Sequence, residues 1–92
     1  MASVTVRAGD GPGRYVVEVA DRGATTTHDV TVPAGFAASL GPSGVDDERL
    51  VEASFAFLLE REPPSSILSR FSLSDIAIYF PDYPEVLVGR LA

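Results

Sequence analysis

Apolar and polar residues alternate in three short runs in the first third of the chain, at about 3–8, 14–20 and 25–32. A repeat of two places successive side chains on opposite faces of a strand, so each run predicts a β-strand with one apolar face. Asp10-Gly11-Pro12-Gly13 and Asp21-Arg22-Gly23, which separate the runs, are typical of tight turns. Connections this short join antiparallel neighbours, and we therefore expect a meander with the 25–32 strand at one edge.

The two faces of this predicted sheet differ in chemistry. One face carries valines, whereas the other is polar, with Thr5, Arg7, Glu18, Thr27 and Thr31. An antiparallel sheet commonly packs one face on the core and leaves the other in water. We expect the remaining elements to cover the valine face, and the polar face is a candidate surface for a partner.

Beyond Pro33 the hydrophobic repeat changes to that of a helix. A helix is predicted at about 44–62, with a wide apolar face formed by Leu50, Val51, Phe55, Leu58 and Leu59. Ser43 followed by Asp46 is a capping-box pattern, in which the two side chains satisfy the free backbone N–H groups at the helix start. Pro63-Pro64 then ends the helix.

Shorter helical segments are predicted on either side of this helix. They lie at about 36–40, 66–70, 73–80 and 84–91. Ser72 and Asp75 repeat the capping-box spacing. Pro84 suits the first residue of the last helix, because proline has no N–H to leave unpaired there.

Together these elements predict one small α+β domain over residues 1–92, in which a three-stranded antiparallel meander is packed by one long helix and followed by short C-terminal helices. Hydrophobic residues make up 46% of the chain, which is typical of a folded protein. No signal-peptide pattern is visible, and the longest apolar run, at 55–59, is too short to cross a bilayer. We expect a cytoplasmic protein without membrane contact.

The charge balance bears on the choice of partner. Thirteen acidic residues against seven arginines give a net charge of −6, so the chain repels phosphate backbones overall. The arginines are scattered, and nucleic acid is therefore a disfavoured partner. The chain has no cysteine and no lysine, which excludes disulfides, thiolate metal sites and lysine-based chemistry. We predict no metal and no cofactor.

His28 is the one histidine of the chain, and histidine is the side chain that ordinarily titrates near neutrality. On the strand pattern it shares a face with Val30 and Val32, while Asp29 points to the other face. We interpret it as a histidine at the rim of the core, hydrogen-bonded to a backbone carbonyl, and we predict no catalytic residue. The alternative is a small enzyme in which His28 is the base and the fold brings a carboxylate close to it.

Aromatic residues gather in the C-terminal third, at Phe71, Tyr79, Phe80 and Tyr83. Short helices need large side chains to anchor them, so a role in the core is favoured. The alternative is a recognition groove in which Tyr79 or Tyr83 presents its hydroxyl group to a partner.

Residues 72–91 resemble a helix-turn-helix motif, with Ala77 in the small position and Phe80 in the apolar one. The likeness departs at the turn, where Pro81 stands in place of the usual glycine. Arg90 is the one basic residue on the presumed reading helix. A DNA-binding regulator is therefore kept as an alternative.

Three stretches resemble a family of small bacterial proteins of unknown function. They are Thr-His-Asp-Val-Thr-Val at 27–32, the segment 55–68 with Phe-Ala-Phe-Leu-Leu-Glu-Arg-Glu-Pro followed by Ser-Ile-Leu at 66–68, and Tyr-Phe-Pro-Asp-Tyr at 79–83. The likeness spans most of the chain beyond residue 14. It implies that the second and third stretches are the family's signature, and it implies no activity. Glu60, Arg61 and Glu62 are either a partner-facing charge cluster or a solvated helix end.

By exclusion, we expect a non-catalytic protein-interaction or regulatory module. Its expected partner is another protein or a second copy of the chain, paired along the 25–32 edge, because unpaired backbone groups bind there without special side chains. Proline at Thr27 or Asp29 is then expected to abolish association without loss of helix content. The candidate partner-binding residues are Thr25, Thr27, His28, Asp29, Thr31, Tyr79 and Tyr83.

Overall fold

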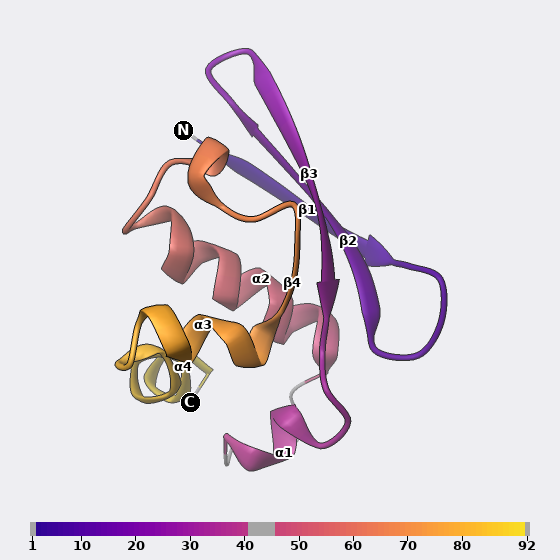
Figure 1. The fold of residues 1–92 in the computed structure, drawn as a ribbon, viewed down its shortest axis with the longest axis vertical. Helices are drawn as coiled ribbons and strands as arrows, with labels where there is room; N and C mark the ends of the chain where they lie inside the picture. Colours follow the sequence, from indigo (N-terminus) through magenta and orange to yellow (C-terminus); the bar gives the residue numbers. More distant parts are fainter. Residues whose placement is uncertain (1, 41–45, 92) are drawn as a thin grey trace.

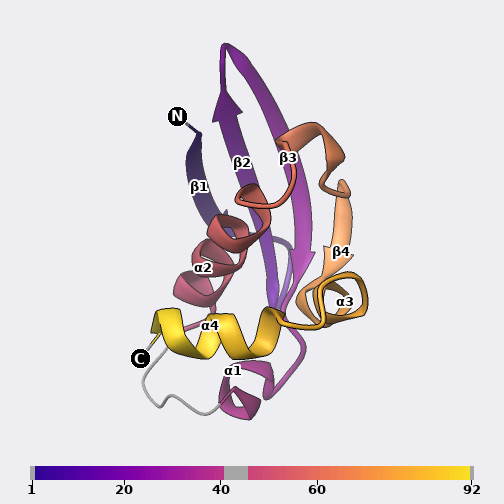
Figure 2. The same ribbon diagram turned by 90° about the vertical axis from the view of Figure 1, so that its left-hand side faces the viewer.

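The chain folds into two layers, a four-stranded sheet and a set of helices that lie on one of its faces (Figures 1 and 2). The computed structural model describes residues 2–40 and 46–91. Its elements are β1 (Ser3–Ala8), β2 (Arg14–Asp21), β3 (Ala24–Thr31), α1 (Phe36–Ser39), α2 (Asp47–Leu59), the 3-10 turn η1 (Pro64–Ser66), β4 (Arg70–Ser72), α3 (Leu73–Tyr79) and α4 (Tyr83–Leu91). The α+β class is as predicted, and the strand order is β1-β2-β3-β4.

The first three strands form the predicted antiparallel meander. Arg22 and Gly23, with φ of 53° and 81°, take the left-handed conformation that a two-residue hairpin turn requires. In the other turn, a Cβ on Gly13 would lie 2.6 Å from the carbonyl oxygen of Val32, so only glycine fits there. The β2–β3 turn is therefore encoded by its own residues, whereas Gly13 is also required by the approach of Val32 at the end of β3.

β4 is a correction to the predicted fold. Residues 66–70 were expected to be helical, but η1 ends at Ser66 and Ile67 is already extended, with ψ of 133°. Arg70–Ser72 then pairs in parallel with the end of β3. Phe71 and Leu73 are buried on either side of a half-exposed Ser72, which is a period-two pattern too short to recognise against the helical segments around it.

α2 lies against the apolar face of the sheet and is shorter than predicted. It begins after Asp46, whose side chain accepts a hydrogen bond from the backbone N–H of Arg49 at 2.8 Å. The predicted cap Ser43 lies outside the described residues, and the observed cap is Asp46. The helix ends at Leu59 rather than residue 62, and the backbone N–H groups of Arg61 and Glu62 both donate to the carbonyl oxygen of Leu58. Glu62 itself is disfavoured in a helix because it precedes Pro63.

The remaining helices confirm most of the short segments that were predicted. α1 is the expected turn after β3, and α4 begins one residue earlier than expected. α3 starts with a complete capping box, in which the Ser72 backbone N–H donates to Asp75 Oδ2 at 3.0 Å. The carboxylate of Asp75 is thereby fixed at the first turn of α3.

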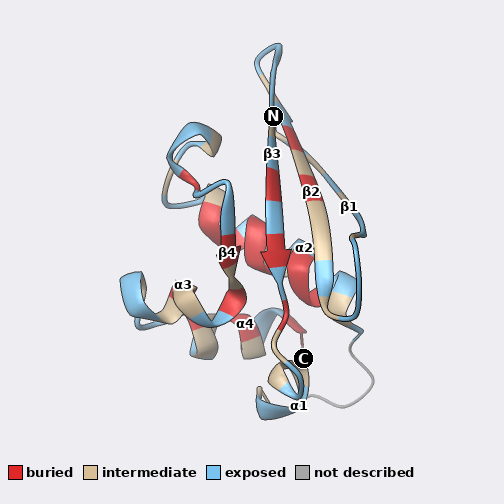
Figure 3. Cartoon of the chain, turned by 45° about the vertical axis from the view of Figure 1, so that its right-hand side comes forward, coloured by how far each residue is buried: buried red, intermediate tan, exposed pale blue. Residues whose placement is uncertain are grey.

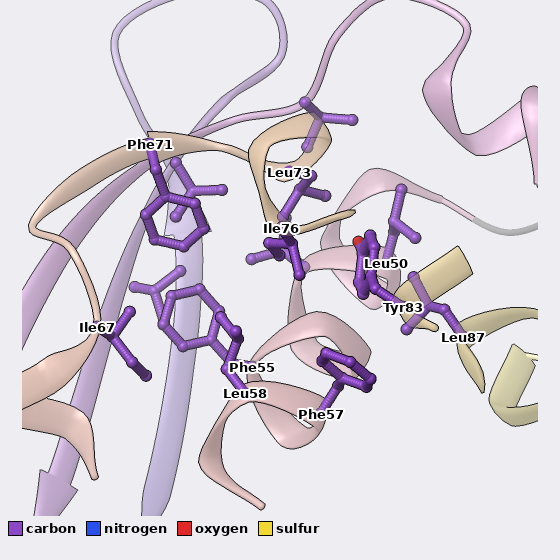
Figure 4. Close-up of a cluster of buried hydrophobic side chains, with 14 of the residues drawn as sticks. Leu50, Phe55, Phe57, Leu58, Ile67, Phe71, Leu73, Ile76, Tyr83 and Leu87 are labelled. Carbon is purple, nitrogen blue, oxygen red and sulfur yellow. The ribbon is translucent and has the colours of Figure 1, made fainter. Parts of the chain in front are cut away.

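The hydrophobic core lies between the sheet and the helices. Buried and exposed residues alternate along β3 (Figure 3), and the buried His28 packs on Phe55 of α2. In the close-up of Figure 4, Ile67 and Phe71 lie beside Phe55, and Tyr83 lies beside Leu50 and Leu87. The core thus joins all parts of the chain, and its fully buried hydrophobic side chains include Val17, Val19, Leu50, Val51, Phe55, Phe57, Leu73, Tyr83 and Leu87.

Candidate binding groove

The β3 edge, where we expected a partner strand, is already paired over part of its length. The last three residues of β3 face β4, and the backbone N–H of Asp29 donates to the carbonyl oxygen of Ser69 at 2.8 Å. The prediction of an open edge is therefore wrong at Asp29 and Thr31, because a strand from beyond α2 closes it. Thr25 and Thr27 present their backbone groups on the same side and lie beyond the end of β4.

The long open edge of the described sheet is β1. This strand pairs with β2 along its whole length, and its other side has no strand partner in the described part of the chain. Since Gly9 donates its N–H to Arg14 across the β1–β2 turn, the backbone groups of Val4, Val6 and Ala8 point away from β2. The prediction of a three-stranded sheet placed the partner-binding edge at residues 25–32, on the opposite side of the sheet.

The polar face of the sheet gathers the side chains that the alternation assigned to it. Thr5 lies opposite Glu18, which lies opposite Thr27. Arg7 Nη1 donates to Glu18 Oε1 at 2.7 Å. The described helices all lie on the other side of the sheet, so this face is open to solvent (Figure 2). Its central charges are paired with each other.

His28 is buried, with 2% of its surface exposed, and it cannot contact a partner as we had predicted. Its Nδ1 lies 2.7 Å from the carbonyl oxygen of Leu68, and its Nε2 lies 2.9 Å from Oγ1 of Thr26. Because a carbonyl oxygen only accepts, Nδ1 carries the hydrogen. The ring also packs on Phe55, with 5.4 Å between the centroids. His28 therefore links β3 to the 67–69 segment, as the rim-of-core interpretation predicted.

Tyr83 is also buried, and its prediction as a partner-binding residue is wrong. Its hydroxyl oxygen lies 2.7 Å from Oγ of Ser54, which in turn donates to the carbonyl oxygen of Leu50 at 2.8 Å. Tyr83 is therefore the donor to Ser54. Burial raises the pKa of Tyr83 to about 12, and the bond to Ser54 lowers it in part. The hydroxyl group anchors α4 to α2 inside the core.

Tyr79 behaves differently, since 68% of its surface is exposed. It stands at the rim of a groove of about 250 Å³ between the end of α2, the 66–68 segment, β4 and α3. Leu68, which is 54% exposed, lines the same groove. The residues that line it are Leu58, Glu62, Ser66, Ile67, Leu68, Phe71, Asp75, Ile76, Tyr79 and Phe80.

The groove has an apolar wall and an acidic border. Leu58, Ile67, Phe71 and Ile76 line it and also belong to the core cluster, in which Figure 4 labels them. Its charged lining residues are Glu62 and Asp75, and no arginine is among the described residues that line it. An apolar surface next to unpaired negative charge is an arrangement that favours a ligand with both apolar and cationic groups.

Two arginines near the groove, Arg61 and Arg90, form ion pairs within the protein. Arg61 places its guanidinium carbon 3.7 Å from the centroid of the Phe57 ring and donates to Asp82 Oδ2 at 2.9 Å. Arg90 is paired with Glu60, and this bond lowers the pKa of Glu60. Arg61 and Glu60, which follow α2, thus link it to Asp82 and to Arg90 of α4. Arg90, the basic side chain of the predicted DNA-reading helix, is exposed but paired with Glu60.

The sequence-based predictions named Tyr79 and missed the other groove residues. Leu58 and Ile67 were assigned to helices, and Phe71 to the core, but their convergence depends on β4. Residues of the 55–68 and 79–83 segments line the groove. The local feature that indicates the groove is an exposed Leu68 next to a buried Ile67. It is a weak indication, because single exposed leucines are common on protein surfaces.

Compared with protein-family models, with curated proteins and with solved structures, the chain matches none of them. Within residues 2–40 and 46–91, no helix is long and apolar enough to cross a membrane. The same residues contain no group of three histidine, aspartate or glutamate side chains placed to hold a metal ion.

Proposed function

We propose that this protein is a non-catalytic interaction module that binds a segment of another polypeptide in the groove beside Tyr79. The observation that carries the proposal is the coincidence of two exposed large apolar side chains, Leu68 and Tyr79, with a concave apolar floor. Exposed apolar surface of this kind marks sites that another molecule covers when it binds.

The size of the groove supports a side chain as its occupant. Small-molecule sites usually measure about 300–1,000 Å³, whereas this groove measures about 250 Å³. A cavity of roughly 150 Å³ already accepts a benzene ring. One large apolar side chain, or two smaller ones, fits this volume and acts as an anchor.

Pairing along β3 is a weaker basis for the same function. Thr25 and Thr27 are the outward-facing residues left beyond β4, and two residues provide few backbone hydrogen bonds. The enzyme alternative lacks support from His28, because both ring nitrogens are engaged inside the protein. The DNA-binding alternative lacks support from Arg90, which is paired with Glu60.

The test is selection of random phage-displayed peptides on the purified protein. Leu68→Ala and Tyr79→Ala remove rim side chains, and Ile78→Ala is the matched control because Ile78 is 73% exposed on α3 but does not line the groove. We expect enriched peptides to carry a large apolar residue and to lose about tenfold or more in affinity with either rim variant, but not with the control. Absence of any enriched peptide, or equal losses in all three variants, would contradict the proposal.

A further inference from the structure

From the charges that border the groove, we infer that the bound segment is a basic one, in which the apolar anchor is flanked by arginine or lysine. This inference rests on the proposed function and adds the chemistry of the partner. It concerns the two carboxylates, Glu62 and Asp75, that line an otherwise apolar groove.

The two carboxylates come from different elements, and each has an oxygen to offer. Asp75 uses Oδ2 to accept the backbone N–H of Ser72, which holds the carboxylate at the start of α3 and leaves Oδ1 for a ligand. Glu62 follows α2, and its backbone N–H is bonded to the carbonyl oxygen of Leu58. Among the described residues, no ion pair involves Glu62 or Asp75.

No described arginine lines the groove itself, although Arg22 and Arg61 line a neighbouring hollow together with Glu62. Arg61 is held over Phe57 and by Asp82, and Arg90 is held by Glu60. Arg70 lies close in sequence, but its guanidinium is 3.8 Å from Asp29 on the open face of the sheet. The charged residues that line the groove are therefore both acidic, in a chain whose net charge is −6. A cationic partner is attracted to such a surface and an acidic one is repelled.

The apolar floor and the two carboxylates of the groove act on a partner over different distances, and measurements at different salt concentrations therefore distinguish their contributions. Burial of the anchor requires contact with the apolar floor and changes little with salt. The attraction between partner cations and the carboxylates is screened by salt, with a Debye length of about 10 Å at 0.1 M. We therefore expect affinity for a basic segment to fall as salt rises, towards that of an uncharged segment with the same anchor.

Three labelled peptides that share one central phenylalanine and differ in their flanking residues, arginine, glutamine or glutamate, provide the test by fluorescence anisotropy. We expect the affinity order arginine, then glutamine, then glutamate at low salt. Glu62→Gln should weaken the arginine peptide about two- to fivefold, the range of an exposed ion pair, and leave the glutamine peptide unchanged. Glu85→Gln, which removes the same charge from an exposed position of α4 outside the groove, is the matched control.

The outcomes separate this inference from the proposed function. Equal binding of the arginine and glutamine peptides, lost in Tyr79→Ala, overturns the charge inference and leaves the groove as a binding site. The same loss for Glu62→Gln and Glu85→Gln also overturns it, since the effect is then one of net charge. Absence of binding by all three peptides overturns the inference and the proposed function together.

Discussion

At the scale of single residues, hydrogen bonds between buried polar groups join elements that are distant in the sequence. Ser54 and Tyr83 come from α2 and α4 and satisfy each other in the core, while His28 spans from β3 to the backbone at Leu68. No buried side-chain nitrogen or oxygen in the described residues lacks a hydrogen-bond partner. These groups are stabilising because each has a partner, and removing one partner leaves the other desolvated.

Replacing Ser54 by alanine is therefore expected to cost about 1–3 kcal/mol of unfolding free energy, because the Tyr83 hydroxyl group loses its acceptor inside the core. Tyr83→Phe should cost less, since Ser54 keeps its bond to Leu50. Urea denaturation of both single variants and the double variant measures the coupling. Additive effects of the two changes would show that the hydroxyl groups do not depend on each other.

The raised pKa of Tyr83 predicts a loss of stability in alkali. Its ordinary value is 10.0 and burial raises it to about 12, so the folded state binds the phenolic proton more tightly than the unfolded chain does. The stabilisation is complete below pH 10 and is lost as the pH rises towards 12, by on the order of 2 kcal/mol. Tyr83→Phe should flatten this dependence in denaturation measured between pH 8 and 11.5. An unchanged slope would assign the effect to Tyr15, whose pKa is raised by burial and by Asp47.

At the scale of elements, the pairing of β4 with β3 decides which surfaces are available. It closes half of the β3 edge, and it carries Ile67, Phe71 and α3 into the positions that form the groove. On the side of β3 that faces β4, the backbone N–H of Asp29 donates a hydrogen bond to the carbonyl oxygen of Ser69.

Proline at two positions of β3 tests this role. Thr27 and Asp29 both point their N–H away from β2, so proline spares that ladder at either position. Asp29→Pro removes the bond to Ser69 and should lower the unfolding free energy by about 1–3 kcal/mol more than Thr27→Pro does. Hydrogen exchange at Phe71 and Ser72 should accelerate only in the Asp29 variant. Equal effects of the two prolines would mean that β4 contributes little.

At the scale of the whole molecule, the groove combines segments that are distant in sequence and leaves apolar side chains in water. The exposed side chains of Leu68 and Tyr79 lower the solubility of the protein and contribute little to its folding free energy. Both effects are expected of residues that form a binding surface.

The double variant Leu68→Ser with Tyr79→Ser should accordingly keep its stability to within about 0.5 kcal/mol, because both side chains are mostly exposed. Its denaturation midpoint is to be compared with that of Ile67→Ser, which removes a buried neighbour and should cost several times more. A loss above about 1 kcal/mol in the double variant would identify these two residues as part of the core rather than of a binding surface.

The sequence by itself determined the features that depend on neighbouring residues. The three strands follow from alternation, their turns from glycine, and the start of α3 from the capping box of Ser72 and Asp75. The apolar face of α2 was also predicted, although Ser54 and Phe57 were not recognised as part of it. Local patterns suffice here because hydrogen bonds within a turn or a helix start join residues only a few positions apart.

Only the tertiary structure decided the features that join distant segments. β4 depends on three residues pairing with a strand forty positions earlier, and the local pattern of so short a strand resembles that of the helices beside it. The same pairing buried His28 and closed part of the β3 edge, so that β1 is the long open edge among the described strands. The packing of α4 on α2 buried Tyr83, whereas Tyr79 is exposed at the groove. Which of two similar side chains is buried depends on the elements packed over it, and the spacing along the chain carries no information about that.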